Sequence, residues 1–231
     1  MPDLNFRSTR LERIDTGDYT AAEYDRFLKE IAFINRFLGD RRALRRSLFA
    51  EVERRGLTEF SLLDVGCGSG ELLRYAAEFA RAKGIKARLA GLDLNPVSAS
   101  VSAAGTREFP EIAVTQGDAF RLPFADGAFD FAISSLFFHH LTDEQIPLVL
   151  SEMRRVARRG VFVIDLHRHA AAYRLYRLFS RAFFISPLVR EDGSLSVLRG
   201  FRPEELARIA GIWNVRRSFP FRLVLECGER A

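Results

Sequence analysis

The fold of this chain is decided by one short stretch, Leu62-Leu63-Asp64-Val65-Gly66-Cys67-Gly68-Ser69-Gly70. The apolar run around Asp64 predicts a buried strand, and the residues after Gly70 have helical spacing. Glycines between a strand and a helix let the backbone turn tightly and let a ligand approach it. The first N–H groups of such a helix have no partner within the helix and can bind that ligand. The stretch therefore predicts a ligand site at the end of a strand.

The spacing of the glycines distinguishes between two classes of ligand. A dinucleotide site uses the pattern G-x-G-x-x-G/A, whose third small residue packs helix against strand. Counted from Gly66 and Gly68, that third position is Glu71. Asp64 also disfavours a dinucleotide, because its carboxylate would repel a pyrophosphate but attract the ammonium group of an amino-acid ligand. Spacing and charge both favour S-adenosylmethionine (SAM).

Two further acidic residues stand where the next two predicted strands end. Asp93 closes the first of these strands, about where an acidic residue meets ribose hydroxyls in nucleotide-binding α/β folds. Asp118 follows the second strand and is placed to accept a hydrogen bond from an adenine amino group. Ligands of such folds bind at the carboxyl ends of the strands. We therefore expect Asp64, Asp93 and Asp118 to share one edge of the sheet.

The middle of the chain alternates short apolar runs with helical patterns, which predicts a mostly parallel sheet with helices on both faces. Strands are expected at residues 61–65, 88–93, 112–116, 129–134 and 161–166. Helices are expected at 70–83, 96–104 and 143–157. A last helix begins at Pro203, and strands at 213–217 and 221–227 are close enough to form a hairpin. The predicted fold class is α/β and Rossmann-like.

Helical segments precede the first strand and follow the fifth. One helix is expected at 19–38, with a capping box of Thr20 and Glu23, and an arginine-rich helix is expected at 40–55. We interpret residues 1–58 as an N-terminal helical cap and residues 59–231 as the cofactor-binding domain, both within one compact domain. Residues 168–201 form a lid-like helical insertion.

The first half of that insertion is aromatic and basic, and it has three interpretations. Its aromatic residues supply the walls of a substrate pocket, or they are ordinary core packing. The third interpretation is a basic amphipathic helix that rests on an anionic membrane. The residues concerned are Tyr173, Tyr176, Phe179, Phe183 and Phe184.

Composition limits the partners and cofactors that are expected. The 231 residues are 48% hydrophobic, enough for one substantial core, and no apolar stretch approaches the roughly 20 residues that span a bilayer. We expect a cytoplasmic protein, monomeric or homodimeric. Its only cysteines, Cys67 and Cys227, indicate neither a disulfide framework nor a metal site. The net charge of +5 comes from scattered arginines without a recognition motif, so no nucleic-acid partner is expected.

Taken together, these motifs resemble the class I SAM-dependent methyltransferases, in the group that includes the ubiquinone/menaquinone-biosynthesis enzymes. The matching stretches are residues 63–70, 91–95, 117–119, 122–124 with 129–130, and 138–141. The resemblance implies a seven-stranded sheet whose last strand is antiparallel. It also implies SAM as the cofactor and S-adenosylhomocysteine as its product.

The resemblance further implies a role for each cofactor residue. Asp64, Gly66 and Gly70 hold the methionine end, Asp93 holds the ribose, and Asp118 with Ala119 holds the adenine. The point of methyl transfer is lined by two residues at the end of the fourth strand, Ser134 and Ser135. Three more residues complete the predicted cofactor site, namely Cys67, Gly68 and Leu94.

Methyl transfer is an in-line displacement, so a base is needed only if the acceptor loses a proton. His139 and His140 follow the fourth strand and are candidates to accept a phenolic proton, and Asp165 is a candidate to orient that base. Alternatively, the histidines pack or cap a helix, and Asp165 is a hydrogen-bonded loop acid. We expect O-methylation of a small aromatic or polyketide-like hydroxyl. The alternatives are C-methylation of a quinone or lipid precursor and a non-catalytic SAM-fold interaction module.

Overall fold

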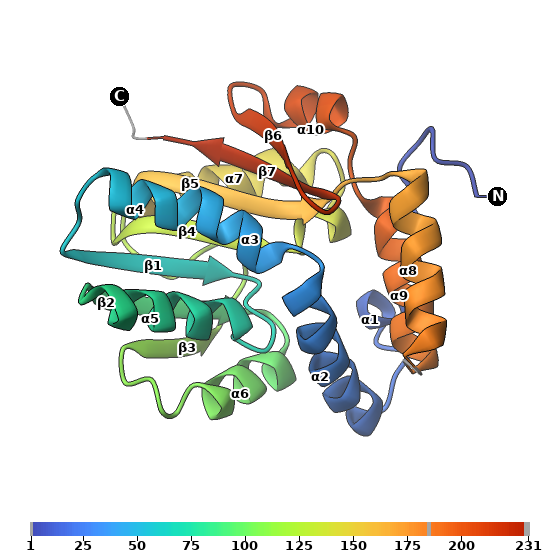
Figure 1. Cartoon of the computed structure of the whole chain (residues 1–231), viewed down its shortest axis with the longest axis horizontal. Coiled ribbons are helices and arrows are strands. Elements are labelled where there is room, and N and C mark those ends of the chain that lie inside the picture. Colours follow the sequence, from blue (N-terminus) through green and yellow to red (C-terminus); the bar gives the residue numbers. More distant parts are fainter. Residues whose placement is uncertain (1, 184–185, 229–231) are drawn as a thin grey trace.

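The computed structural model describes residues 2–183 and 186–228, and within these a single sheet forms the centre of the molecule (Figure 1). The sheet has seven strands in the order β3-β2-β1-β4-β5-β7-β6. Their bounds are β1 Glu59–Val65, β2 Lys86–Asp93, β3 Ile112–Gln116, β4 Phe129–Ser135, β5 Ala157–Leu166, β6 Asn214–Ser218 and β7 Arg222–Cys227. The last strand, β7, is antiparallel to both β5 and β6, and the other neighbouring pairs are parallel. The predicted Rossmann-like fold is confirmed.

Helices cover both faces of this sheet. On one face lie α5 (Glu71–Lys83) and the N-terminal helices α3 (Asp40–Leu44) and α4 (Ala50–Arg54). On the other lie α7 (Gln145–Val156) and α10 (Pro203–Ala210), while α6 (Pro96–Gly105) packs beside β2 and β3.

The central strands are mostly apolar because they are buried on both faces. Successive side chains of a strand point to opposite sides. Leu62 of β1 accordingly belongs to one hydrophobic core and its neighbour Leu63 to the other, and both are fully buried. This explains why the sequence shows continuous apolar runs rather than an alternating pattern.

Before the sheet, the chain forms α1 (Arg13–Thr16) and the long helix α2 (Ala21–Phe37). The predicted capping box is present: the Glu23 amide donates to Thr20 Oγ1 at 3.2 Å, and the Thr20 amide donates to Glu23 Oε2 at 2.8 Å. The segment predicted as a helix at 40–55 is helical from Asp40 to Arg54 but contains a π-helical segment, η1 (Arg45–Phe49), between α3 and α4.

The insertion after β5 is a pair of helices, α8 (Ala170–Ala182) and α9 (Pro187–Arg199). Figure 1 shows this pair beside α2, at the carboxyl ends of the parallel strands. Tyr24 and Leu28 of α2 pack with Tyr176 of α8 and Val189 of α9 in a third hydrophobic core. None of the helices in the described ranges is both long enough and apolar enough to cross a membrane.

Candidate active site

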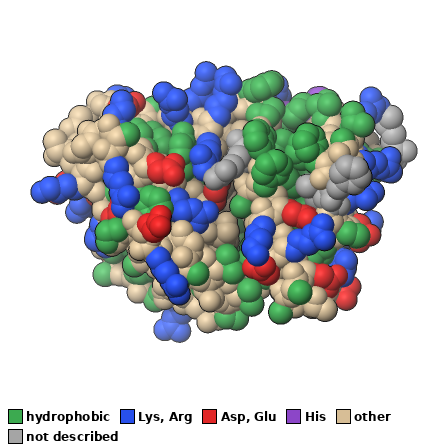
Figure 2. All heavy atoms as spheres, turned by 60° about the horizontal axis from the view of Figure 1, so that its bottom comes forward, with side chains coloured by type: hydrophobic (Ala, Val, Ile, Leu, Met, Phe, Trp, Pro, Cys, Tyr) green, Lys and Arg blue, Asp and Glu red, His purple; other side chains and the backbone are tan. Residues whose placement is uncertain are grey.

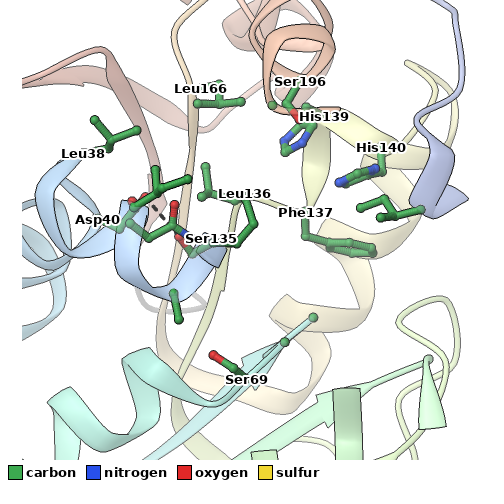
Figure 3. A pocket seen from close by; sticks show the side chains of 18 of the residues that line it. Leu38, Asp40, Ser69, Ser135, Leu136, Phe137, His139, His140, Leu166 and Ser196 are labelled. Atoms are coloured by element: carbon green, nitrogen blue, oxygen red, sulfur yellow. Dashed lines mark hydrogen bonds between the residues drawn. The ribbon is translucent and has the colours of Figure 1, made fainter. Parts of the chain in front are cut away.

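A large cavity lies where the carboxyl ends of the strands face α2, α8 and α9 (Figure 3). Its volume is about 860 Å³, within the usual range for ligand sites. One side is lined by the loops that follow β1, β2, β3 and β4. The other is lined by helical residues from the N-terminal segment and the insertion. The fold therefore brings the predicted cofactor residues and the predicted lid to one continuous space.

The loop between β1 and α5 has the shape that its glycines predict. Gly66, Gly68 and Gly70 adopt φ angles of 74°, 53° and 70°, in the left-handed region that favours glycine. A Cβ on Gly66 would lie 3.0 Å from Cγ of Phe137, which leaves little room for a side chain. The Gly68 amide donates to Oδ2 of Asp93 at 2.9 Å, so this loop is fastened to the end of β2.

Asp64 is the acid of this site that most clearly lacks a partner. Its side chain is almost fully buried at the end of β1, and its Oδ1 has no hydrogen-bond partner. Burial, together with the charges of Asp93 and Glu71, raises the pKa of Asp64 to about 8. A buried carboxyl without a partner on a cavity wall is a fitting site for the ammonium group of an amino-acid ligand.

Asp93 and Asp118 also reach the cavity. Asp93 accepts backbone hydrogen bonds from Gly68 and Asn95, and burial raises the pKa of its carboxyl. Asp118 accepts from the Phe120 amide at 2.9 Å. The residues of the predicted cofactor site that line the cavity are Asp64, Gly66, Cys67, Gly68, Asp93, Leu94, Asp118, Ala119 and Ser135.

Two predicted cofactor residues lie outside this lining. Ser134 is fully buried between strands, where its hydroxyl donates to the Val65 carbonyl at 2.7 Å. Gly70 is the N-cap of α5, and a Cβ there would collide with Ser102 of α6. In the structure, Ser134 joins β4 to β1, and Gly70 lets α6 approach the start of α5.

A turn of 3₁₀ helix, η2 (Phe138–His140), presents the two predicted histidines to the cavity (Figure 3). His139 is buried, and its Nδ1 lies 2.8 Å from Oδ1 of Asp165 on β5. The His139 amide donates to the other oxygen of Asp165 at 3.1 Å. Burial raises the pKa of Asp165, but the charge of His139 and its hydrogen bonds outweigh this and hold that pKa below its usual value. Asp165 lies behind His139 and does not line the cavity itself.

The N-terminal segment adds a residue that the sequence gave no reason to select. Glu12, just before α1, is almost fully buried and lines the cavity. Its Oε2 accepts from Ser196 of α9, while its Oε1 has no hydrogen-bond partner and lies 3.8 Å from Nε2 of His139. Burial raises the pKa of Glu12 to about 7. No periodicity or motif marks Glu12, since its partners are far away in the sequence.

Arg199, at the end of α9, fixes the position of the histidine turn. It donates to the carbonyls of His139 at 3.0 Å and His140 at 2.8 Å, and it also pairs with Asp15 at 2.6 Å. Asp15 in turn lies 2.7 Å from Nδ1 of His140. The insertion and the N-terminal segment thus both contact the histidine turn, and sequence patterns predicted neither contact.

The remaining wall of the cavity is mostly apolar. The predicted lid residues Tyr176, Phe179 and Phe183 line it, and Tyr176 also belongs to the hydrophobic core that joins α2, α8 and α9. Tyr176 therefore both lines the cavity and packs in a hydrophobic core. Tyr173 instead lines two smaller hollows beside Arg177 and Arg181. Phe184 lies outside the described residues.

Comparison with known proteins places these features in a family. A family model described as a methyltransferase domain matches residues 63–164. The chain is 30% identical to a demethylmenaquinone methyltransferase of Bacillus velezensis over 171 residues. The aligned region covers 67% of this chain and 71% of that protein. It is 33% identical to a 2-phytyl-1,4-naphtoquinone methyltransferase of Synechocystis over 112 residues. That aligned region covers 46% of this chain and 45% of the other protein.

Solved structures show the same fold at lower sequence identity. A magnesium protoporphyrin IX methyltransferase from Synechocystis with bound S-adenosylhomocysteine has a TM-score of 0.64 at 16% identity, covering 95% of this chain and all of that one (100%). A SAM-dependent methyltransferase from Aquifex aeolicus has a TM-score of 0.55 at 19% identity, covering 78% of this chain and 88% of that one.

Proposed function

Because the chain belongs to the class I SAM-dependent methyltransferases of the ubiquinone/menaquinone type, we propose that it methylates a hydroxyl of a small, largely apolar aromatic acceptor. The observation that carries this proposal is the continuity of the cavity. The acids Asp64, Asp93 and Asp118 line one part, the aromatic residues of α8 line another, and His139 lines the same space. An acceptor held against the apolar wall can therefore meet both the cofactor and a base.

When bound, SAM supplies a methyl group on a sulfonium. Asp64 would hold the ammonium group of the methionine end, because its buried oxygen without a partner suits that charge. Asp93 would accept hydrogen bonds from the ribose hydroxyls, and Asp118 would accept one from the adenine amino group. Ser135 lines the same cavity as these residues and the histidines. These roles hold the reacting groups close and aligned, which is the main requirement of an in-line displacement.

His139 is proposed as the base, with Asp165 as its positioning partner. A neutral histidine that donates through Nδ1 to Asp165 presents an unprotonated Nε2, and that atom accepts the proton of the acceptor hydroxyl. The resulting imidazolium lies between Asp165 and Glu12, both of which stabilise its positive charge. The acceptor oxygen is then an anion and a better nucleophile. His140 borders the same space and is proposed to help orient the acceptor.

The test is turnover with SAM and a panel of alkylated phenols, with methylated product detected by mass spectrometry. His139→Ala should lower kcat, and His140→Ala should mainly raise KM. His167→Ala is the matched control, because His167 follows β5 but does not line the cavity. Full turnover by the His139 and His140 variants on every accepted phenol would contradict the assignment of the base.

A second candidate, C-methylation of a quinone precursor, is favoured by the relatives. Their names describe methyltransferases that act on demethylmenaquinone and on a phytylated naphthoquinone. In this reaction too, the acceptor hydroxyl would lose its proton to His139. The resulting anion would have a higher electron density at the ring carbon next to that oxygen. NMR of the product separates the two reactions, because O-methylation gives a methoxy group and C-methylation gives a methyl group on the ring.

We also propose that this enzyme is cytoplasmic and that it receives its acceptor from a membrane surface. Leu175, Leu178 and Phe183 of the α8 region line the cavity and are yet 55%, 67% and 56% exposed. Phe33 and Phe37 of α2 are exposed as well. Figure 2 shows apolar side chains gathered on one part of the surface, with Lys and Arg side chains beside them. An apolar surface bordered by positive charge suits an anionic membrane, in which a lipid-soluble acceptor dissolves.

A further inference from the structure

Three side chains that carry metal-binding atoms meet at the histidine turn. Glu12, His139 and His140 each offer one ligand atom, a carboxylate oxygen or a ring nitrogen, and these atoms all lie within 4.8 Å of one another. All three residues line the cavity, and Figure 3 shows the two histidine rings next to each other there. Two imidazoles and one carboxylate are a donor set that zinc and related transition metals prefer.

The carboxylate of Glu12 has an oxygen without a protein partner. Glu12 is 1% exposed, and its Oε2 accepts a hydrogen bond from Ser196. Its Oε1 has no hydrogen bond and lies 3.8 Å from Nε2 of His139. Arg199 Nε lies 3.9 Å from this oxygen but donates instead to the His139 carbonyl at 3.0 Å. A buried polar atom without a partner costs free energy, which a cation bound to it would recover.

Each histidine has one ring nitrogen held by a carboxylate and the other nitrogen left over. Nδ1 of His139 lies 2.8 Å from Oδ1 of Asp165. Nδ1 of His140 lies 2.7 Å from Oδ1 of Asp15. An ionised carboxylate keeps the proton on Nδ1, so Nε2 carries the lone pair that a metal needs. Histidines that bind metals almost always donate their other N–H to a carboxylate, a carbonyl or water, and both histidines here already do so.

The distances in the cluster suit one small cation. Two atoms bound to the same tetrahedral zinc at about 2.1 Å lie roughly 3.4 Å apart. The 3.8 Å between Oε1 of Glu12 and Nε2 of His139 is close to this value. The side chain of His140 is 17% exposed, so its ring can turn toward the other two ligands. Three protein ligands leave a further position for water from the cavity.

We propose that Glu12, His139 and His140 form a binding site for Zn²⁺ and similar divalent transition metals, and that an ion bound there inhibits methyl transfer. The inhibition rests on the proposed function, whereas the binding does not. A metal bound to Nε2 of His139 occupies the lone pair that would accept the proton of the acceptor. The metal-free protein is therefore the active form, and the supply of zinc regulates turnover.

Binding is measured on the full chain without a polyhistidine tag, after treatment with a chelator. Calorimetry should show a single Zn²⁺ per chain, and Co²⁺ should develop the strong visible absorption of a site with few ligands. Mg²⁺ should not bind, because it prefers oxygen ligands. Glu12→Gln and His140→Ala should each weaken Zn²⁺ binding by about tenfold or more, since even losing the partner of a ligand commonly costs that much. No binding by the wild type, or unchanged affinity in both variants, would overturn the proposal.

His167→Ala is the matched control. His167 also has a histidine beside it, with its ring centroid 5.6 Å from that of His169, but neither of these residues lines the cavity. The control variant should bind Zn²⁺ as the wild type does, and a loss of affinity there would place the ion elsewhere and overturn the site. Zn²⁺ should also raise the Tm of the wild type and of His167→Ala but not that of Glu12→Gln, whose Tm without metal shows that it is folded.

Turnover assays test the inhibition. Zn²⁺ should suppress methylation of every accepted phenol by the wild type at concentrations that saturate the site, and EDTA should restore it. The Zn²⁺ concentration that halves turnover should rise by about tenfold or more in His140→Ala, in step with the loss of affinity, and stay unchanged in His167→Ala. Stimulation by Zn²⁺, or full turnover with the site saturated, would overturn the inhibition. Absence of methylation with and without metal would refute the proposed function alone, because calorimetry measures the site without turnover.

Discussion

The imidazole of His139 and the carboxylate of Asp165 lie 2.8 Å apart, and both side chains are almost fully buried, although only His139 lines the cavity. Asp165 also accepts the His139 amide, so one carboxylate fixes both the backbone and the ring of the histidine. This arrangement determines which ring nitrogen carries the proton, because Nδ1 must donate to an ionised Asp165. β5 carries Asp165 and thus sets the orientation of the proposed base. η2 carries His139 itself and places it at the cavity.

Asp165→Asn should lower kcat by roughly 10²-fold or more, the scale of a lost general base. The asparagine amide can donate to Nδ1, which forces the proton onto Nε2 and removes the lone pair that faces the acceptor. SAM affinity, measured by calorimetry, should remain unchanged because Asp165 does not line the cavity. Equal kcat in the variant would show that Asp165 is a structural acid only.

Glu12 should make the protein less stable as the pH rises. Its pKa is about 7 in the folded chain, above its ordinary value, so between these values the folded chain binds a proton that the unfolded chain has lost. The free energy of unfolding should therefore fall by about 3 kcal/mol between pH 4.5 and 7 through this group. The charges of His140, Arg199 and Asp15 also shift the pKa of Glu12. The pH dependence of the wild-type stability must therefore be compared with that of a variant.

Glu12→Gln is that variant, because it keeps the shape of the side chain and cannot ionise. Urea unfolding at pH 5 and pH 8 should give a smaller loss of stability in Glu12→Gln than in the wild type. Parallel losses in the two proteins would show that Glu12 does not titrate in this range.

Binding of SAM should release a proton through Asp64. At pH 7 its carboxyl is mostly protonated, since its pKa is about 8, and a bound ammonium group would favour the ionised form. Calorimetry in two buffers with different heats of ionisation should detect close to one released proton, and affinity should increase from pH 6 to pH 8.

Asp64→Asn provides the control for this linkage. It should abolish the proton release and weaken SAM binding by about 1–3 kcal/mol, the scale of a lost buried charged hydrogen bond. Proton release that persists in the variant would assign it to another group.

The apolar surface around the cavity should bind anionic vesicles. Sedimentation with phosphatidylglycerol-containing vesicles should pellet the wild type more than vesicles of phosphatidylcholine alone, and added salt should weaken the difference. Leu178→Glu places a charge on this surface and should reduce binding. Ile212→Glu is the matched control, because Ile212 is 82% exposed but lies in the turn between α10 and β6. Equal loss in both variants would contradict a specific membrane face.

The parts of the fold that the sequence predicts are those determined by neighbouring residues. The strand that ends at Asp64, the three glycines and the capping box of Thr20 all depend on residues within a few positions of one another. The sequence predicts the insertion as helical but does not place the bounds of its second helix, α9. This helix contains Gly193, which lies against the ring of Tyr176 where a Cβ would collide, and it lacks a clear apolar face.

The parts of the site that the sequence does not reveal depend on contacts between distant segments. Glu12 meets His139 and Ser196, and Asp40 meets Arg222, only after the sheet and the insertion have formed. Ser134 illustrates a different difficulty, since it and Ser135 are consecutive on one strand and point to opposite faces. Only Ser135 lines the cavity, whereas the hydroxyl of Ser134 bonds to β1.

The cavity draws its two halves from separate stretches of the gene. The cofactor loops come from the middle of the chain, whereas most of the helical wall comes from α2 and from α8 with α9. Recombination or insertion in these outer segments can therefore change the acceptor without disturbing the glycine loop. A chimera that receives both helical segments from a relative should acquire the acceptor of the donor. A chimera that receives only one of these segments would combine residues from two proteins in the hydrophobic core where Tyr24 and Leu28 pack with Tyr176 and Val189. Those residues would not fit one another.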